Sequence, residues 1–128
     1  MRLLLDTHIA IWALVAPDRL TNGERDLIAS LENEVFVSVA SLWEIAIKYP
    51  LSRGRPDALP FSAEEAQGFF IDAGYQILDI SARHALTVEK LPPIHSDPFD
   101  RMLIAQAKAE PMHLLSQDTK VLAYLASG

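Results

Sequence analysis

Four short apolar runs, separated by segments of helical periodicity, constrain the fold of this chain more than any other feature of its sequence. Runs of this length are typical of strands buried on both faces of a parallel sheet. They lie at Arg2 to Leu5, Val35 to Val39, Tyr75 to Ile80 and His113 to Leu115. Two helical segments separate each strand from the next, and they are long enough to cross over between parallel strands. The order βααβααβααβα therefore predicts a three-layer α/β domain.

The expected helices begin and end at recognisable signals. Ser62 and Glu65 form a capping-box pattern at the start of the fourth helix, and Gly74 is expected to stop that helix. Pro50 is expected to help end the third helix, because the residue before a proline is disfavoured in the helical conformation. The helices are expected at residues 8–15, 22–32, 41–49, 62–73, 81–89, 98–109 and 119–125.

Length and composition narrow the class of protein. The chain has 128 residues, of which 50% are apolar, and this fits one domain over residues 1–128 and excludes a disordered chain. It contains no cysteine, which excludes disulfides, thiolate nucleophiles and cysteine metal cages. No apolar run reaches the roughly 18 residues of a membrane helix, and the first run breaks at Asp6, too early for a signal peptide. We therefore expect a cytoplasmic protein with no membrane segment.

The charge balance bears on the partner. A net charge of −6 argues weakly against nucleic acid, because proteins that bind polyanions normally carry an excess of Lys and Arg. This argument loses force if several of the acids surround bound cations, since each divalent ion cancels two negative charges.

Several carboxylates are expected at the carboxyl ends of the predicted strands, where parallel α/β sheets bind their ligands. Asp6 follows the first strand, Glu44 lies in the helix that leaves the second, and Asp118 follows the fourth. Asp100 lies in the first turn of the helix at 98–109. Gathered carboxylates repel one another unless a cation lies among them, and oxygen ligands favour Mg²⁺ or Mn²⁺ over zinc. These residues are candidate metal ligands for phosphodiester hydrolysis by a metal-activated water.

Each of these acids also has an ordinary structural interpretation. Asp6 and Asp118 stand where helix caps are common, and Glu44 lies four residues before Lys48, a helical ion pair worth about 0.3–0.5 kcal/mol. Asp97 has the strongest structural interpretation, because Asp97-Pro98-Phe99-Asp100 places Asp at the N-cap and Pro at the first helical position. The same Asp97 is also an alternative or additional metal ligand beside Asp100, and spacing alone leaves both interpretations open.

The histidines and tryptophans are less informative. His8 and His95 adjoin the expected site, where a loop or helix-start role is favoured over contact with substrate. His84 is expected at the surface. Trp12 and Trp43 fall on apolar helical stripes, which favours core positions over a partner surface.

Four segments resemble the motifs of PIN-domain ribonucleases, in particular the toxin subunit of VapBC-type toxin–antitoxin pairs. They are spread over nearly the whole chain in the order of that family, at Leu4 to Trp12, Ser38 to Ala46, His95 to Ala107 and Leu115 to Asp118. The resemblance implies a PIN-like, Rossmann-like fold with a four- to five-stranded parallel sheet. It further implies a Mg²⁺- or Mn²⁺-dependent endoribonuclease that cleaves single-stranded RNA, forms a homodimer and is held inactive by a cognate antitoxin.

The resemblance also implies roles for individual residues. Thr7 matches the hydroxyl residue that follows the first acid, and Ser116 stands where the family often has Thr. Arg101 belongs to the Asp-Pro-Phe-Asp-Arg form of the third motif, where it either contacts phosphate or pairs with a carboxylate of the antitoxin or of the core. The acidic quartet of the family, which holds the metal, falls on Asp6, Glu44, Asp100 and Asp118. Basic residues that could line a path for RNA are Lys48, Arg53, Arg55, Arg101 and Lys120.

Two rival interpretations remain at the level of sequence. An aspartyl-phosphate enzyme needs a second acid close to the first or a well-placed Lys, whereas Thr7 and His8 follow Asp6. The stronger rival is a non-catalytic PIN-like module that binds RNA or a protein partner. The family often adds a strand after the last motif, and the sequence leaves open whether the sheet here has four strands or five.

Overall fold

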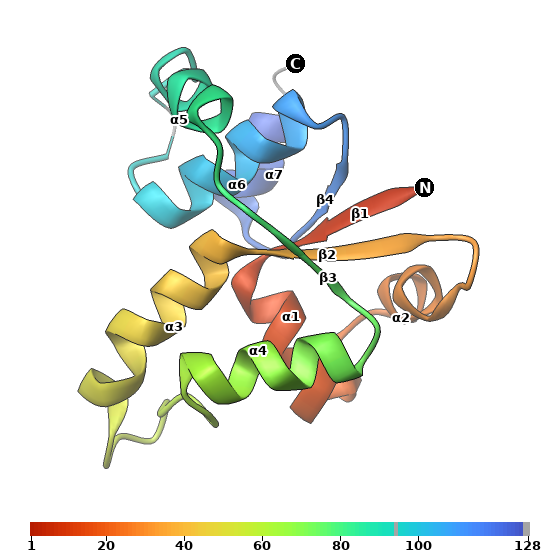
Figure 1. Ribbon diagram of the computed structural model, residues 1–128, viewed down its shortest axis with the longest axis vertical. Coiled ribbons are helices and arrows are strands. Elements are labelled where there is room, and N and C mark those ends of the chain that lie inside the picture. The colour runs from red at the N-terminus through yellow and green to blue at the C-terminus, as the bar shows by residue number, and fades with distance from the viewer. Residues whose placement is uncertain (94, 127–128) are drawn as a thin grey trace.

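Four parallel strands form a sheet in the computed structural model, which describes residues 1–93 and 95–126 (Figure 1). Their order across the sheet is β3-β2-β1-β4, so the first strand of the chain lies in the middle and has a partner on each side. The predicted parallel α/β architecture is confirmed, with four strands in the described part of the chain. The strands are β1 (Arg2–Leu5), β2 (Glu34–Ser38), β3 (Gln76–Leu78) and β4 (His113–Leu115).

Helices fill every connection, in the order that the sequence predicts. A short 3₁₀ turn at Pro17–Arg19 separates the first two of them. Within the residues that the structure describes, no helix combines the length and the apolar character needed to cross a membrane. The helices are α1 (Thr7–Val15), α2 (Asn22–Ala29), α3 (Val39–Ser52), α4 (Ala63–Asp72), α5 (Ala82–Glu89), α6 (Pro98–Ala109) and α7 (Thr119–Ala126).

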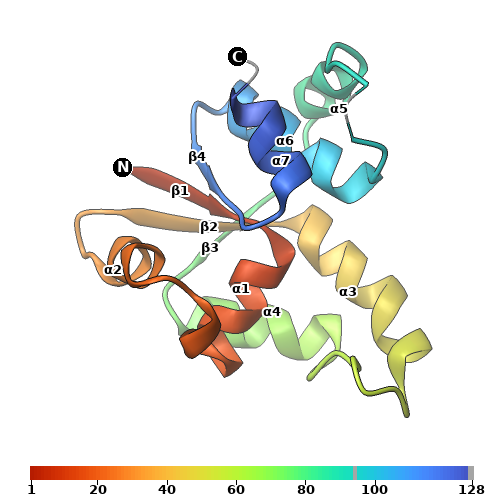
Figure 2. The same ribbon diagram turned by 180° about the vertical axis from the view of Figure 1, so that it is seen from behind.

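Alternating side chains of the strands build one core on each face of the sheet. Leu3 and Leu5 of β1 pack in a cluster with residues of α1 and α4, whereas Leu4 packs in a second cluster with residues of α6 and α7. Figures 1 and 2 accordingly show α1, α2 and α4 on one side of the sheet and α5 to α7 on the other. Burial on both faces is the reason that the strands read as continuous apolar runs.

The end of α3 differs from the prediction. The helix runs on through Pro50 to Ser52 instead of ending before the proline. A proline fits the helical φ and removes only one amide donor. The carbonyl group of Tyr49, one residue before it, accepts hydrogen bonds from Ser52 Oγ at 2.9 Å and Arg53 Nε at 3.2 Å. These bonds satisfy the carbonyl of Tyr49 in the last turn of α3, which continues past the proline that was expected to stop it.

The end of α4 confirms the predicted glycine stop. Gly74 has φ +88°, a left-handed conformation that costs a residue with a Cβ about 1–2 kcal/mol. The amide of Gly74 donates to Ile71 O at 2.9 Å, and the amide of Tyr75 donates to Phe70 O at 3.0 Å. These two bonds make a Schellman motif, which turns the chain directly into β3.

We expect the substitution of Gly by Ala to have opposite effects on stability at Gly68 and at Gly74. Gly68 lies in α4 with no atom within 4 Å of an added Cβ, so Gly68→Ala is expected to stabilise the protein by about 0.5–1 kcal/mol. Gly74→Ala also has space but must adopt the positive φ, so it is expected to destabilise the protein by about 1–2 kcal/mol. Urea unfolding of both variants measures the two changes. Equal changes of the same sign would contradict the helix end described above.

Candidate functional site

Asp6 occupies the carboxyl end of the central strand, between the ends of β2 and β4. It is only 5% exposed. Its Oδ1 accepts a hydrogen bond from the amide of Ile9 at 2.9 Å and so caps α1, while its Oδ2 accepts one from the hydroxyl of Ser116 at 2.6 Å. Burial raises the pKa of Asp6, against the opposing effect of these hydrogen bonds. The Asp6 side chain therefore both caps α1 and lies in the predicted site.

Ser116 joins Asp6 to the second acid of the site. Its Oγ donates to Asp6 and accepts a hydrogen bond from the amide of Asp118 at 3.1 Å. Asp118 is exposed, and its Oδ1 accepts hydrogen bonds from the amides of Lys120 at 2.8 Å and Val121 at 3.3 Å at the start of α7. Asp118 is thus also placed as a helix cap, immediately beside Asp6.

Asp97 and Asp100 have different roles at the start of α6: Asp97 caps the helix, and Asp100 faces the predicted site. Asp97 is the N-cap, and its Oδ1 accepts hydrogen bonds from the amides of Phe99 at 2.9 Å and Asp100 at 3.0 Å. Asp100, at the third helical position, leaves its own carboxylate free to face the ends of the strands. Burial raises the pKa of Asp100, His95 opposes that change, and the neighbouring charges of Asp97 and Glu44 add to it.

His95 fixes the orientation of the Asp100 carboxylate. The side chain is buried, and its Nε2 lies 2.7 Å from Asp100 Oδ2. Its Nδ1 accepts from the amide of Asp97 at 3.4 Å, so the imidazole carries its proton on Nε2 and donates it to the carboxylate. Sequence left this residue open between a loop role and a substrate contact. The arrangement matches the outer-shell partners that orient metal-ligating carboxylates.

Glu44 approaches the same space from α3. It is 6% exposed, and its Oε2 lies 2.5 Å from Nζ of Lys48, as the predicted helical spacing requires. Burial acts to lower the pKa of Lys48, but the carboxylates of Glu44, Asp97 and Asp100 outweigh it and raise that pKa. The ammonium group therefore stays charged and compensates part of the negative charge of the site.

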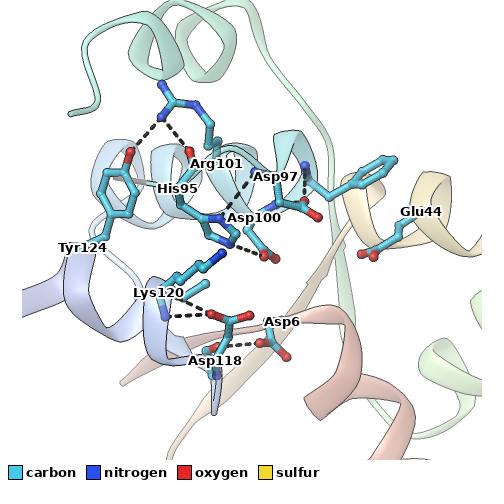
Figure 3. A network of polar contacts seen from close by, with 12 residues as sticks. Asp6, Glu44, His95, Asp97, Asp100, Arg101, Asp118, Lys120 and Tyr124 are labelled. Atoms are coloured by element: carbon cyan, nitrogen blue, oxygen red, sulfur yellow. Dashed lines mark hydrogen bonds and ion pairs between the residues drawn. The ribbon is translucent and has the colours of Figure 1, made fainter. Parts of the chain in front are cut away.

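Figure 3 shows how these side chains lie relative to one another. The carboxylates of Asp6, Asp100 and Asp118 face a common space, and that of Glu44 points toward it from α3. One ligand atom each of His95, Asp100 and Asp118 lie within 4.8 Å of one another. Both ring nitrogens of His95 are already engaged in hydrogen bonds. The atoms left to bind a cation here are therefore carboxylate oxygens. Such a donor set fits Mg²⁺ or Mn²⁺ better than zinc.

Thr7 and Arg101 stabilise the elements around the site. The hydroxyl of Thr7 donates to Ser41 Oγ at 2.9 Å and ties α1 to α3. The guanidinium of Arg101 donates to the hydroxyl of Tyr124 at 2.7 Å and so reaches α7. It also donates to the carbonyl groups of Val88, Pro92 and His95. These bonds hold the segment before α6 in place. In the described part of the chain they engage Arg101 with carbonyl and hydroxyl groups rather than with a carboxylate.

Two residues lie where the sequence did not place them. His84 was expected at the surface but is 2% exposed, with its Nδ1 accepting from the amide of Ser81 at 3.0 Å and its Nε2 lying 2.7 Å from Glu110 Oε2. Trp43 was expected in the core but is 57% exposed, and its ring makes an edge-on contact with Phe99. A helical stripe does not reveal these positions, because they depend on how α5 packs against α6 and on which face of α3 is left exposed.

Comparisons with known proteins identify the family. The family model of the PIN domain matches residues 3–126, and the chain therefore belongs to the PIN domain family. A solved structure with the same fold is that of VapBC2 from Rickettsia felis bound to a DNA fragment from their promoter. The two chains share 20% sequence identity with a TM-score of 0.70, over 97% of this chain and 93% of the other. No curated protein matches the sequence.

The raised pKa of Asp6 predicts how stability depends on pH. A carboxyl whose pKa is raised in the folded state stabilises the fold when protonated, and this stabilisation is lost as the pH rises through the folded-state pKa. In Asp6→Asn, the amide oxygen keeps the cap and no charge is buried. We therefore expect the variant to be more stable than the wild type near neutral pH in EDTA, with a gain that shrinks as the pH falls toward 3.8, the ordinary aspartate value. Urea unfolding across this range measures it; a gain independent of pH would contradict the burial of a charge.

Asp97 and Asp100 are expected to respond differently to substitution. Asp97→Ala removes the cap of α6 and should cost about 0.5–2 kcal/mol of unfolding free energy while metal binding persists. Asp100→Asn should fold normally and lose the binding of Mg²⁺ or Mn²⁺ in a calorimetric titration. Asp97→Asn, which keeps the cap, is the matched control. If Asp97→Asn loses the metal and Asp100→Asn keeps it, the two assignments are reversed.

Proposed function

We propose that this chain is a metal-dependent endoribonuclease and acts as the toxin of a toxin–antitoxin pair. The observation that carries the proposal is that the carboxylates of Asp6, Asp100 and Asp118 face one space at the carboxyl end of the sheet. They come from the end of β1, from α6 and from the segment after β4. Membership of the PIN domain family supports a nuclease activity. On this proposal residues 1–128 form one PIN domain, located in the cytoplasm.

The carboxylates of Asp6, Asp100 and Asp118, with Glu44 opposite them, are the groups we assign to metal binding and catalysis. These residues would hold a Mg²⁺ or Mn²⁺ ion, which would supply positive charge beside the phosphodiester and make a water molecule available for its hydrolysis. Ser116 holds Asp6 in position, and His95 does the same for Asp100. These hydrogen bonds fix both carboxylates before any ligand arrives, which reduces the reorganisation needed for the reaction.

Lys48 has a part in this proposal as an internal counter-cation. Its ammonium group already lies among the charges of Glu44, Asp97 and Asp100. When RNA is bound, the same group lies where it can attract a phosphate of the strand. Apart from this group, the net negative charge of the chain gives little attraction to phosphates. We therefore expect modest affinity for RNA that depends only weakly on salt.

The proposed protein partners are a cognate antitoxin and a second copy of the chain. The structure of VapBC2 from Rickettsia felis, which holds a chain of the same fold in a complex, supports an antitoxin partner. The exposed side chains of Trp43, Ile47 and Leu51 on α3 offer apolar surface for a protein contact.

A non-catalytic PIN-like module is the second candidate, and a specific observation favours it. Asp6, Asp97 and Asp118 each accept hydrogen bonds at the start of a helix, so local structure alone explains much of their placement. Caps do not explain Asp100, whose carboxylate contacts His95 and faces the other acids.

A cleavage assay on single-stranded RNA decides between the two candidates. We expect cleavage with Mg²⁺ or Mn²⁺ and none in EDTA. Because Asn caps helices as well as Asp does, Asp6→Asn and Asp118→Asn should keep the fold and lose activity by about 100-fold or more. Asp26→Asn, an exposed acid on α2, is the control and should cleave normally. Activity that survives in the folded Asp6→Asn and Asp118→Asn variants would rule out the proposed site.

A further inference from the structure

Two aromatic rings stand next to the acidic site on the first turns of α1. His8 and Trp12 are four residues apart and therefore lie on the same side of the helix. Their ring centroids are 5.6 Å apart with an interplanar angle of 33°. The guanidinium of Arg19 lies 5.6 Å from the centroid of the Trp12 ring, at the distance of a cation–π contact. His8 is exposed and Trp12 is partly buried. The His8 ring is therefore accessible to a ligand, and the Trp12 ring beside it is held by the surrounding protein.

The same two rings face the carboxylates. A hollow of about 240 Å³ is lined by Asp6, His8, Trp12, Gln117 and Asp118. The amide nitrogen of Gln117 donates to Arg19 O at 3.1 Å and to Glu24 Oε1 at 2.7 Å, which holds this wall in place. An aromatic surface and the ends of two candidate metal ligands are thus brought into one small space.

A second hollow continues from His8 in the direction of α3. It has a volume of about 410 Å³, and its lining includes two basic residues, Lys48 and Arg55, and one acidic residue, Asp57. His8 lines both hollows, so it stands between the acidic space and a groove that carries two cationic side chains. A nucleic acid strand carries negatively charged phosphates on one side and flat apolar bases on the other. Its phosphates therefore match the cationic side chains of the groove, and its bases match the aromatic rings.

We propose that His8 and Trp12 form a stacking platform for an unpaired base of the RNA strand, with Lys48 and Arg55 beside its phosphates. This inference rests on the proposed nuclease function and adds to it the residues that would hold the strand beside the acidic site. Every base has a π-face that can stack on an aromatic ring, whereas in a duplex both faces are already covered by neighbouring bases. The platform therefore selects for an unpaired strand with little preference for sequence. It also supplies affinity that a chain of net charge −6 does not gain from phosphate contacts alone.

Binding without cleavage tests the platform. The probe is a fluorescein-labelled oligouridine of about ten nucleotides in EDTA, followed by anisotropy. We expect His8→Ala to weaken binding about tenfold and His8→Phe, which restores a ring without a charge, to bind within about twofold of the wild type. His113→Ala, an exposed histidine at the start of β4, is the matched control and should bind normally. Because His8 is exposed, its substitution leaves the core intact.

A second readout reports on Trp12 directly. In a Trp43→Phe background Trp12 is the remaining tryptophan of the sequence, and stacking of a base should quench its emission as the oligouridine is added. A matched RNA duplex should quench it less. Absence of binding by the wild type, equal affinities of the wild type and His8→Ala, or equal losses in His8→Ala and His8→Phe would each overturn the platform.

The two proposals fail in different ways. Quenching that persists in a protein unable to cleave RNA with Mn²⁺ overturns the nuclease and supports the platform. Cleavage by a wild type whose affinity is unchanged in His8→Ala overturns the platform and supports the nuclease.

Discussion

The pairing of β1 with both β2 and β4 is the constraint on which the rest of the structure depends. It places Leu3, Leu4 and Leu5 at the centre of the sheet with no exposed surface, and it sets the end of this strand beside the ends of its two neighbours. Asp6 is the first residue beyond the buried leucines. Its position is therefore determined by the packing of an entire sheet, and the hydrogen bond from Ser116 then fixes its carboxylate.

The site keeps charges where the protein would be more stable without them. Burial raises the pKa of Asp6 and of Asp100, which means that folding works against their ionised forms. Hydrogen bonds from Ser116 and His95 and the charge of Lys48 offset only part of this cost. The proposed metal would offset the rest of this cost, whereas a purely structural cap could lie in solvent at a lower cost.

Sequence reasoning predicted what depends on local signals and missed what depends on packing. The order of elements follows from periodicity, and the stop at Gly74 follows from its φ. The burial of His84 and the exposure of Trp43 depend on how neighbouring helices dock, which a stripe of apolar residues does not encode. The position of the candidate acids near one another could be predicted because parallel strands end at one edge of the sheet. The contact of His95 with Asp100 could not, since it depends on the course of the loop before α6.

The parallel register of β1 and β4 joins residues from opposite ends of the sequence, with Leu3 beside His113 and Leu5 beside Leu115. Contacts of such long sequence separation cannot form early in the life of a chain. During synthesis, Asp6 has neither its hydrogen-bond partner Ser116 nor the neighbouring Asp118 until β4 and the residues after it have been added. A growing chain thus cannot bring these carboxylates together before β4 and Asp118 have been synthesised.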